Sequence, residues 1–212
     1  MKWIKLFLVQ KMISKNNFFY FIIFIFVVSC SSVPRQPSNA CKIFGEKYLW
    51  NKNIKKSSEK YDVPIHIILA FVNKESGFNR WAKPERQKLF KIIPYKRPSS
   101  SYGYSQAVKK TWEQYKKETG NPLALRTHFK DSVMFIGWYI SKTNKINKIP
   151  LSDSYRQYLN YYLGWGAYAK KAYKTDKKSV LFAKSVQKQS KIYKNQLAEC
   201  QNSLDRKKYV IF

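Results

Sequence analysis

Apolar residues recur at intervals of three and four along the chain from Cys41 onward, and no long alternation with period two is present. This spacing is typical of helices that bury one face, not of strands. The pattern therefore predicts an all-α fold. The expected helices cover residues 62–77, 106–119, 131–143, 153–163 and 178–205.

Capping residues support these boundaries. Asp62 followed by Pro64 is typical of a helix start, and Gly77 is typical of a helix end. Residues 81–101 lack helical periodicity and contain three prolines, so we expect a long loop there. Long loops on a rigid scaffold often carry function.

The N-terminus has a different pattern, an unbroken apolar run over residues 18–28 that follows two lysines and is soon followed by Cys30. The run is too short to cross a bilayer. A basic start, a short apolar run and a small residue before a cysteine are typical of bacterial lipoprotein signals. We expect residues 1–29 to be a signal peptide and Cys30 to be lipidated. A start at Met12 would make the signal more compact, and a membrane anchor in which Cys30 plays no part is the alternative.

This interpretation gives the chain three parts. Residues 30–41 are small, polar and proline-bearing, as expected of a tether, and residues 42–212 are expected to form one folded domain. Ser31 favours sorting to the outer membrane, so we expect the domain to be lipid-anchored on the periplasmic face of a bacterial membrane. There, Cys41 and Cys200 form an even pair that suggests a disulfide, with two buried thiols as the alternative.

The composition limits the classes of molecule that the protein is expected to bind. The 212 residues include 41 Lys+Arg and 12 Asp+Glu, for a net charge of +29, with 44% hydrophobic content. That apolar share excludes a disordered basic tail. The charge indicates a polyanionic partner, or it reflects biased codon usage. Because the chain carries an export signal, we expect no nucleic-acid partner. His66 and His128 are isolated and no cysteine–histidine cluster exists, so the sequence predicts no metal site and no cofactor.

One acid departs from the helical pattern. On a helical wheel Glu75 falls within the apolar stripe that includes Phe71 and Val72, whereas His66 falls on the opposite, polar face. Every other acid has a helix start or a basic residue nearby. Burial raises the pKa of a carboxyl, and a general acid needs this to hold its proton near neutral pH. Glu75 is therefore the candidate acid, unless the helix frays near Gly77 and the side chain points to solvent.

Four segments in order carry a resemblance to a known family. They are Glu-Ser-Gly-Phe-Asn at 75–79, Ser-Ser-Ser-Tyr-Gly-Tyr-Ser-Gln at 99–106, Asp-Ser-Val-Met-Phe-Ile-Gly-Trp-Tyr at 131–139, and Tyr-Leu-Asn-Tyr-Tyr-Leu-Gly-Trp-Gly-Ala-Tyr at 158–168. These resemble the Glu-Ser-x-Phe-Asn signature, the Gly-Tyr-Ala-Gln segment, the third helix and the Ala-Tyr-His-Glu-Gly segment of the lytic transglycosylases with a soluble-lysozyme-like (SLT) domain. The closest likeness is to their short lipoprotein branch, and it covers about residues 42–205.

The resemblance implies a lysozyme-like helical domain that binds peptidoglycan and cleaves the MurNAc–GlcNAc bond as a carbon–oxygen lyase, leaving 1,6-anhydroMurNAc. It implies that Glu75 is the general acid and then the base. Gln106 would orient the substrate and Tyr161 would flank the acid. The residues expected to bind substrate are Ser100, Gly103, Tyr104, Gln106 and Tyr161. We expect a monomer without cofactor or metal.

Two departures from the family concern substrate contacts more than chemistry. Tyr162 and Leu163 replace the branch's His-Glu, and Ser105 replaces the alanine before the glutamine. Two other functions stay open, a lysozyme-like hydrolase that shares the fold and the acid, and a non-catalytic wall-binding lipoprotein. Aromatic rings can stack on sugar faces, although most of those near the motifs are expected to lie in the core. The candidates are Trp81, Trp112, Trp138, Trp165 and Tyr104.

Overall fold

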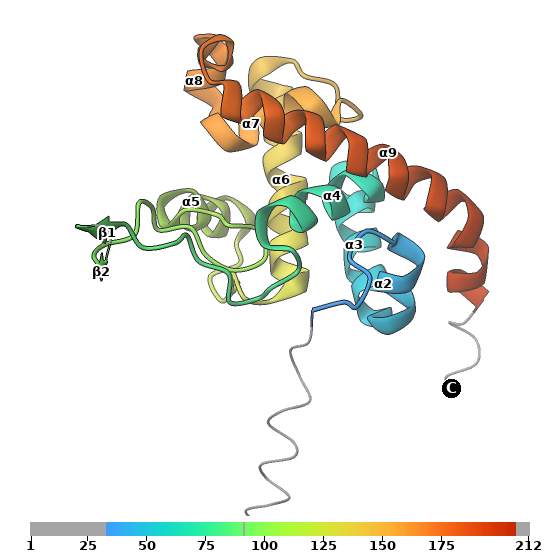
Figure 1. Cartoon of the computed structure of the whole chain (residues 1–212). Coiled ribbons are helices and arrows are strands. Elements are labelled where there is room, and N and C mark those ends of the chain that lie inside the picture. Colours follow the sequence, from blue (N-terminus) through green and yellow to red (C-terminus); the bar gives the residue numbers. More distant parts are fainter. Residues whose placement is uncertain (1–32, 91, 207–212) are drawn as a thin grey trace, which may run out of the picture. The chain divides into compact units, whose positions relative to one another are not determined.

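The computed structural model describes residues 33–90 and 92–206, and within these it contains eight α-helices, one 3-10 helix and one two-stranded hairpin (Figure 1). The predicted all-α fold is therefore confirmed. The α-helices are α2 (Ala40–Glu46), α3 (Tyr48–Tyr61), α4 (Ile65–Ser76), α5 (Lys109–Thr119), α6 (Phe129–Asn147), α7 (Ser154–Leu163), α8 (Trp165–Ala169) and α9 (Lys177–Arg206). The remaining elements are η1 (Ala172–Lys174) and the antiparallel strands β1 (Lys88–Leu89) and β2 (Ile93–Pro94).

The predicted signal peptide over residues 1–29, the alternative start at Met12 and the lipidation site Cys30 lie outside the described residues. Among the helices that the structure does describe, none combines the length and apolar character needed to cross a bilayer.

Five of the helices, α4 to α7 and α9, correspond to those predicted from hydrophobic spacing. The start of α4 differs, because Asp62 does not cap it. Asp62 instead ends α3 in a left-handed conformation with φ 55°, and α4 begins at Ile65. Aspartate tolerates this conformation better than most residues, and a residue before a proline, here Val63, disfavours helix.

Helix α3 was not predicted because polar residues interrupt its buried face. Asn51 and Ser57 are buried beside Ile54, which breaks the apolar spacing. Ser57 is satisfied because its Oγ donates to the backbone oxygen of Val133 in α6 at 2.7 Å. A polar side chain that is paired in this way gives no hydrophobic signal, although it packs as well as an apolar one.

Helix α4 lies in the centre of the fold and packs against α3, α6 and α9. Six consecutive residues, 67–72, are buried. Its polar face is also covered, because His66 Nδ1 lies 2.9 Å from Ser190 Oγ and Asn73 Nδ2 donates to the Tyr193 hydroxyl at 2.7 Å, both across the contact with α9. Burial, with a smaller effect of nearby Lys194, lowers the pKa of His66 to about 4. The side opposite the apolar stripe therefore packs on a neighbouring helix.

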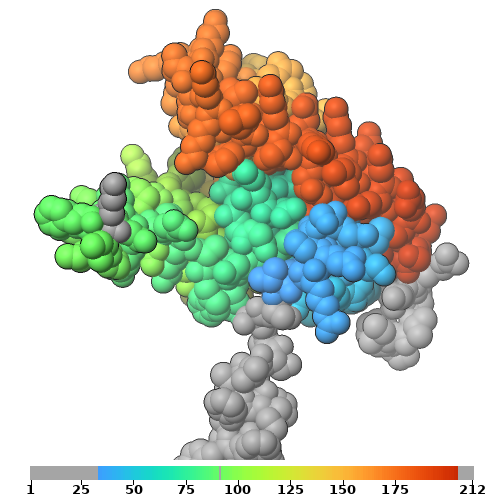
Figure 2. Space-filling view, viewed as in Figure 1, coloured from blue at the N-terminus to red at the C-terminus, as the bar shows by residue number. Residues whose placement is uncertain are grey.

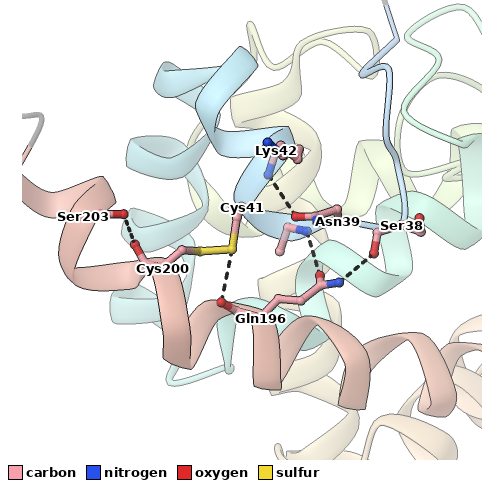
Figure 3. Close-up of a disulfide and its surroundings, with 8 residues drawn as sticks. Ser38, Asn39, Cys41, Lys42, Gln196, Cys200 and Ser203 are labelled. Atoms are coloured by element: carbon pink, nitrogen blue, oxygen red, sulfur yellow. Dashed lines mark hydrogen bonds between the residues drawn. A yellow bond between two sulfur atoms is a disulfide. The ribbon is translucent and has the colours of Figure 1, made fainter.

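The part of the expected tether that the structure describes is docked on the domain. The backbone oxygen of Pro37 accepts from the Tyr193 hydroxyl and from Asn73 Nδ2. The side-chain amide of Gln196 in α9 accepts from Ala40 N at 2.9 Å and donates to the Ser38 oxygen at 3.3 Å (Figure 3). Folded structure therefore begins before residue 42, where the sequence placed the domain boundary.

A disulfide between Cys41 and Cys200 joins α2 to α9 beside these contacts, with the two Cα atoms 6.0 Å apart (Figure 3). It connects positions 159 residues apart and closes a loop that contains nearly the whole domain. Of the two alternatives left by the sequence, the structure has the paired one.

We expect the double variant Cys41→Ser/Cys200→Ser to fold but to lose about 3–5 kcal/mol of unfolding free energy, because the disulfide restricts the unfolded chain. Urea unfolding of the exported domain measures this difference. Wild-type protein treated with reductant should unfold like the double variant. Two reactive thiols in unreduced, unfolded protein that lacks Cys30 would contradict the pairing.

Candidate active site

The last turn of α4 positions Glu75. The helix ends at Ser76, and Gly77 closes it in the left-handed conformation, with φ 55° and its N–H donating to the Asn73 oxygen at 2.9 Å. Phe78 follows with its side chain buried in the core, which fixes the chain directly after the turn. The helix therefore continues through Glu75, and the carboxyl stays on the same side as the apolar stripe.

The Glu75 side chain is partly buried and accepts a hydrogen bond from one neutral donor. The Tyr158 hydroxyl of α7 donates to Glu75 Oε1 at 2.7 Å. Burial raises the pKa of Glu75 from its ordinary value of 4.5 to about 7, and the Tyr158 hydrogen bond and the charge of Lys74 oppose that rise. The side chain can therefore hold its proton at neutral pH and also release it, as a group that acts in turn as acid and base must do.

Tyr161 lies on the same face of α7, one turn after Tyr158. Its hydroxyl donates to the backbone oxygen of Ser105 at 2.5 Å, and its ring packs edge-on against Phe71 of α4 with centroids 5.2 Å apart. Burial, and then the nearby Glu75 carboxyl, hold the pKa of Tyr161 well above its usual range. Tyr161 is therefore uncharged and lies beside the acid.

The sequence analysis missed Tyr158, the tyrosine that contacts the acid. The spacing of three residues within a helix placed Tyr158 and Tyr161 on one face and could have identified both.

Glu75 opens into a pocket of about 370 Å³. Figure 2 shows the surface hollowed between the region of α7 and α8 (orange) and the segment that precedes and includes α5 (green). The lining comes from α4, the 101–108 segment, α5, α6 and the end of α7. The lining residues are Glu75, Ser101, Gln106, Ala107, Val108, Thr111, Phe135, Tyr139, Tyr161, Tyr162, Leu163 and Gly164. Glu75 is the one acid among them.

Gln106 lines the pocket in a fixed orientation. Its backbone is left-handed with φ 48°. Its side-chain nitrogen donates to the backbone oxygens of Ala82 and Gly103, at 2.9 and 2.8 Å. Both amide hydrogens are thereby used, and the carbonyl oxygen is the part of the amide that can accept a hydrogen bond from a ligand.

Three of the expected substrate-binding residues are not in the pocket lining. Ser100 Oγ accepts from Lys109 N at 3.0 Å and so holds the first residue of α5, and the neighbouring Ser101 lines the pocket instead. Tyr104 is buried in the core, with its ring 5.6 Å from Trp50.

Gly103 has a structural role. Its φ is 75°, and a Cβ there would lie 2.0 Å from the backbone oxygen of Arg126, so only glycine fits. Of the five residues that the resemblance named for substrate binding, Gln106 and Tyr161 line the pocket and the other three do not.

A family model of the transglycosylase SLT domain matches residues 18–200, most of the chain. The chain belongs to this family. No curated protein matches it. Membership assigns the chain to the transglycosylase-type enzymes that act on peptidoglycan, and it agrees with the helical architecture.

Of the two departures noted in the sequence, one lies in the SLT pocket of this chain and the other is buried behind it. Tyr162 and Leu163 line it, so the change from His-Glu alters the pocket surface. The Tyr162 ring packs edge-on against Phe182 of α9, with centroids 5.6 Å apart. Ser105 is buried and does not line the pocket, and its Oγ has no hydrogen-bond partner. Ser105 therefore carries a hydroxyl where the family has alanine, and this hydroxyl gains no hydrogen bond within the described residues.

Most of the candidate aromatic residues of this SLT domain belong to the core, as expected. Trp112 and Trp138 are buried, and Trp165 is partly buried with its Nε1 donating to Thr143 Oγ1 at 2.8 Å. Trp81 is exposed and lies beside Tyr102, with centroids 6.5 Å apart. Within the described residues no group of three or more metal-binding side chains is found.

We expect Glu75→Gln to stabilise the SLT domain at alkaline pH. The folded carboxyl keeps its proton up to a pH of about 7, whereas the unfolded one releases it near its ordinary value of 4.5. The folded state thus binds more protons between these values, and the unfolding free energy of the wild type falls as the pH rises through this range. Glutamine keeps the shape and has no proton to lose.

Urea unfolding at several pH values measures this effect. At about pH 8 the variant should be more stable by about 2–3 kcal/mol, since one pKa unit corresponds to about 1.4 kcal/mol. The difference should vanish at about pH 4, where both states of the wild type hold the proton. A difference that does not change with pH would show that the pKa of Glu75 is not raised.

Proposed function

We propose that this protein is a lytic transglycosylase in which Glu75 is the single general acid and base. The proposal rests on the surroundings of Glu75. Its partly buried carboxyl accepts a hydrogen bond from Tyr158, and burial raises its pKa to about 7. It lies at the edge of a pocket that is lined by no other acid. The substrate is the bond between MurNAc and GlcNAc in peptidoglycan strands. Gln106 and Tyr161 are proposed to orient the sugar beside the acid.

In the first step, protonated Glu75 donates its proton to the oxygen that joins C1 of MurNAc to GlcNAc. The C1–O bond breaks, GlcNAc leaves as an alcohol, and positive charge develops at C1. The carboxylate left on Glu75 lies next to that charge and stabilises it. The Tyr158 hydroxyl stays on Oε1 and holds the carboxylate in position during this change.

In the second step, the Glu75 carboxylate takes the proton of the MurNAc 6-hydroxyl, and that oxygen forms a bond to C1. One C–O bond is broken and one is formed. The first proton stays on the GlcNAc hydroxyl, and the proton from the 6-hydroxyl restores Glu75 to its acid form. The product carries a 1,6-anhydro ring, and no water is consumed. This route suits a pocket with one carboxylate, because hydrolysis with two carboxylates needs a second acid to activate a water or to form a covalent intermediate.

The charge of the chain supports the choice of substrate. The protein is strongly basic, with a net charge of +29, and removal of residues 1–29 takes away four lysines and no acid. The peptide stems of peptidoglycan carry carboxylates, which a basic surface attracts over a distance of about one Debye length. We further propose that the enzyme works as a monomer, lipid-anchored through Cys30 on the periplasmic face of the outer membrane.

We expect Glu75→Gln to lower turnover on purified wall sacculi by at least about two orders of magnitude, because glutamine cannot donate or accept the proton. The wild-type products should be muropeptides that end in 1,6-anhydroMurNAc. These are one water lighter than hydrolysed products and resist borohydride reduction. Product analysis by mass spectrometry distinguishes the two chemistries.

Glu113→Gln is a suitable control, because this exposed acid of α5 pairs with Lys116 at 3.1 Å and does not line the pocket. Its turnover should match that of the wild type. Reducing-end MurNAc as the main product would identify a hydrolase. A folded wild-type domain that cleaves nothing would identify a wall-binding protein, consistent with the altered Tyr162–Leu163 wall.

For the anchor, we expect radiolabelled fatty acid to enter the wild-type protein in cells and Cys30→Ala to abolish both the labelling and the membrane association. The reason is that Cys30 is the only residue of the predicted signal junction that could carry the acyl chains. Cell fractionation and fluorography give the measurement. Processing and labelling of Cys30→Ala would contradict the lipoprotein interpretation.

A further inference from the structure

The hairpin of β1 and β2 carries an apolar tip that none of the other residues described by the structure covers. The two strands pair only with each other, with Lys88 opposite Pro94 and Leu89 opposite Ile93. The side chains of Phe90 and Ile92 are 80% and 79% exposed, and Leu89 and Ile93 are also exposed. We call Leu89, Phe90, Ile92 and Ile93 the hairpin tip. Figure 2 shows the hairpin projecting from the domain at the left, in green.

The hairpin is held to the domain at its base. Gln87 N donates to the Lys96 oxygen at 3.0 Å and Tyr95 N donates to the Gln87 oxygen at 2.7 Å, which extends the pairing below the strands. Farther down, the backbone oxygen of Ala82 accepts from Gly103 N and from the Gln106 side chain. The apolar tip is therefore displayed on a defined support, at the end of an arm that starts beside the pocket.

Cations surround the apolar tip. Arg86, Lys88, Lys96 and Arg97 are exposed on the two arms of the hairpin, and Glu85 is the one acid in residues 83–97. The guanidinium groups of Arg86 and Arg97 donate to the backbone oxygens of Tyr95 and Pro84, across the base of the hairpin, so their charge stays on its two arms. The sequence places one more cation, Lys91, between Phe90 and Ile92. An apolar tip above a ring of positive charge matches an anionic lipid surface, with hydrocarbon below the level of the phosphates.

The residue types favour lipid over glycan. Three of the four tip residues are aliphatic, and leucine and isoleucine have no flat face to stack on a sugar ring. Exposed clusters of this kind mark interaction sites. The tip is also separate from the residues that line the pocket. We therefore do not expect a glycan strand in the pocket to bind these side chains.

We propose that the hairpin tip inserts into the surface of an anionic membrane and orients the domain there. The proposal rests on the proposed export and lipid anchor only for the presence of a membrane nearby. Pro34 is buried and Arg35 N donates to Glu46 Oε2 at 3.1 Å, so if Cys30 is lipidated, residues 31–33 alone would separate the lipid from the fold, a reach of about 10–12 Å. The domain would then be held within contact of the lipid surface, and the hairpin would set which face points toward it.

The test uses the chain from Ser31 to Phe212, which lacks the lipid-bearing cysteine and keeps the whole described core. Its only cysteines are the disulfide pair, so Ile92→Cys offers one thiol for an environment-sensitive fluorophore. Vesicles of phosphatidylglycerol and phosphatidylcholine should shift the emission of this label to the blue. The matched control is Leu181→Cys, a position 64% exposed on α9, whose label should not respond.

Sedimentation with the same vesicles tests the side chains themselves. Phe90→Asn/Ile92→Asn should weaken vesicle binding at high salt by about tenfold or more, since at high salt the apolar contribution dominates. Asparagine tolerates the positive φ of 51° at Phe90, so the hairpin should keep its turn. Leu181→Asn should bind vesicles like the wild type.

Activity on solubilised glycan strands separates this proposal from the proposed function. The double hairpin variant should cleave such strands at the wild-type rate, whereas Glu75→Gln should fail to cleave and still bind vesicles. Equal vesicle binding by the hairpin variant and the wild type would overturn the proposal. It would also be overturned if the variant kept vesicle binding but lost cleavage, because the hairpin would then belong to the substrate site.

Discussion

The structure depends on enclosing one ionisable carboxyl at the end of a helix that is buried over most of its length. A charged carboxylate in such a place is costly, and the group responds by binding a proton more tightly. The apolar burial of residues 67–72 fixes α4 between α3, α6 and α9, so Glu75 cannot swing out without moving the core. The free energy gained by the core thus holds the acid in a state that it would not adopt in water.

Helix α7 completes this arrangement from the other side. Tyr158 and Tyr161 both pack edge-on against Phe71, with centroids 5.2 Å away in each case, so the two rings are fixed by the same residue that anchors the acid's helix. Their hydroxyls are then committed to different acceptors, Glu75 and the Ser105 backbone. Neighbouring Tyr162 packs edge-on against Phe182 of α9 and also lies beside Tyr158, with ring centroids 6.4 Å apart. The departure on the pocket surface therefore lies next to the tyrosine that donates to Glu75, although the hydrogen bond on the acid itself comes from Tyr158.

Hydrophobic spacing predicted five helices and identified Glu75. Both predictions use the same local signal, the apolar stripe that runs along each single helix. It could not predict α3, whose buried Asn51 and Ser57 carry no apolar signal. It also could not tell which residues of the 99–106 segment face the pocket. That choice depends on long-range partners, such as Lys109 for Ser100 and Trp50 for Tyr104, which no local pattern encodes. The docking of residues 37–40 likewise depends on Tyr193 and Gln196, far along the chain.

The pKa of Glu75 is a balance of opposing effects, and the balance matters more than burial itself. Burial alone would carry the pKa above 7, and a carboxyl that never loses its proton could not serve as a base. The Tyr158 hydrogen bond favours the charged form, as does the ammonium group of Lys74, which lies 3.7 Å from the centre of the Phe182 ring. Lys74 is itself partly desolvated there, and its pKa is lowered, so its charge acts through less water than an exposed lysine would. In the proposed reaction Glu75 gives one proton to the leaving GlcNAc oxygen and takes another from the MurNAc 6-hydroxyl, and a pKa near the ambient pH makes both transfers accessible.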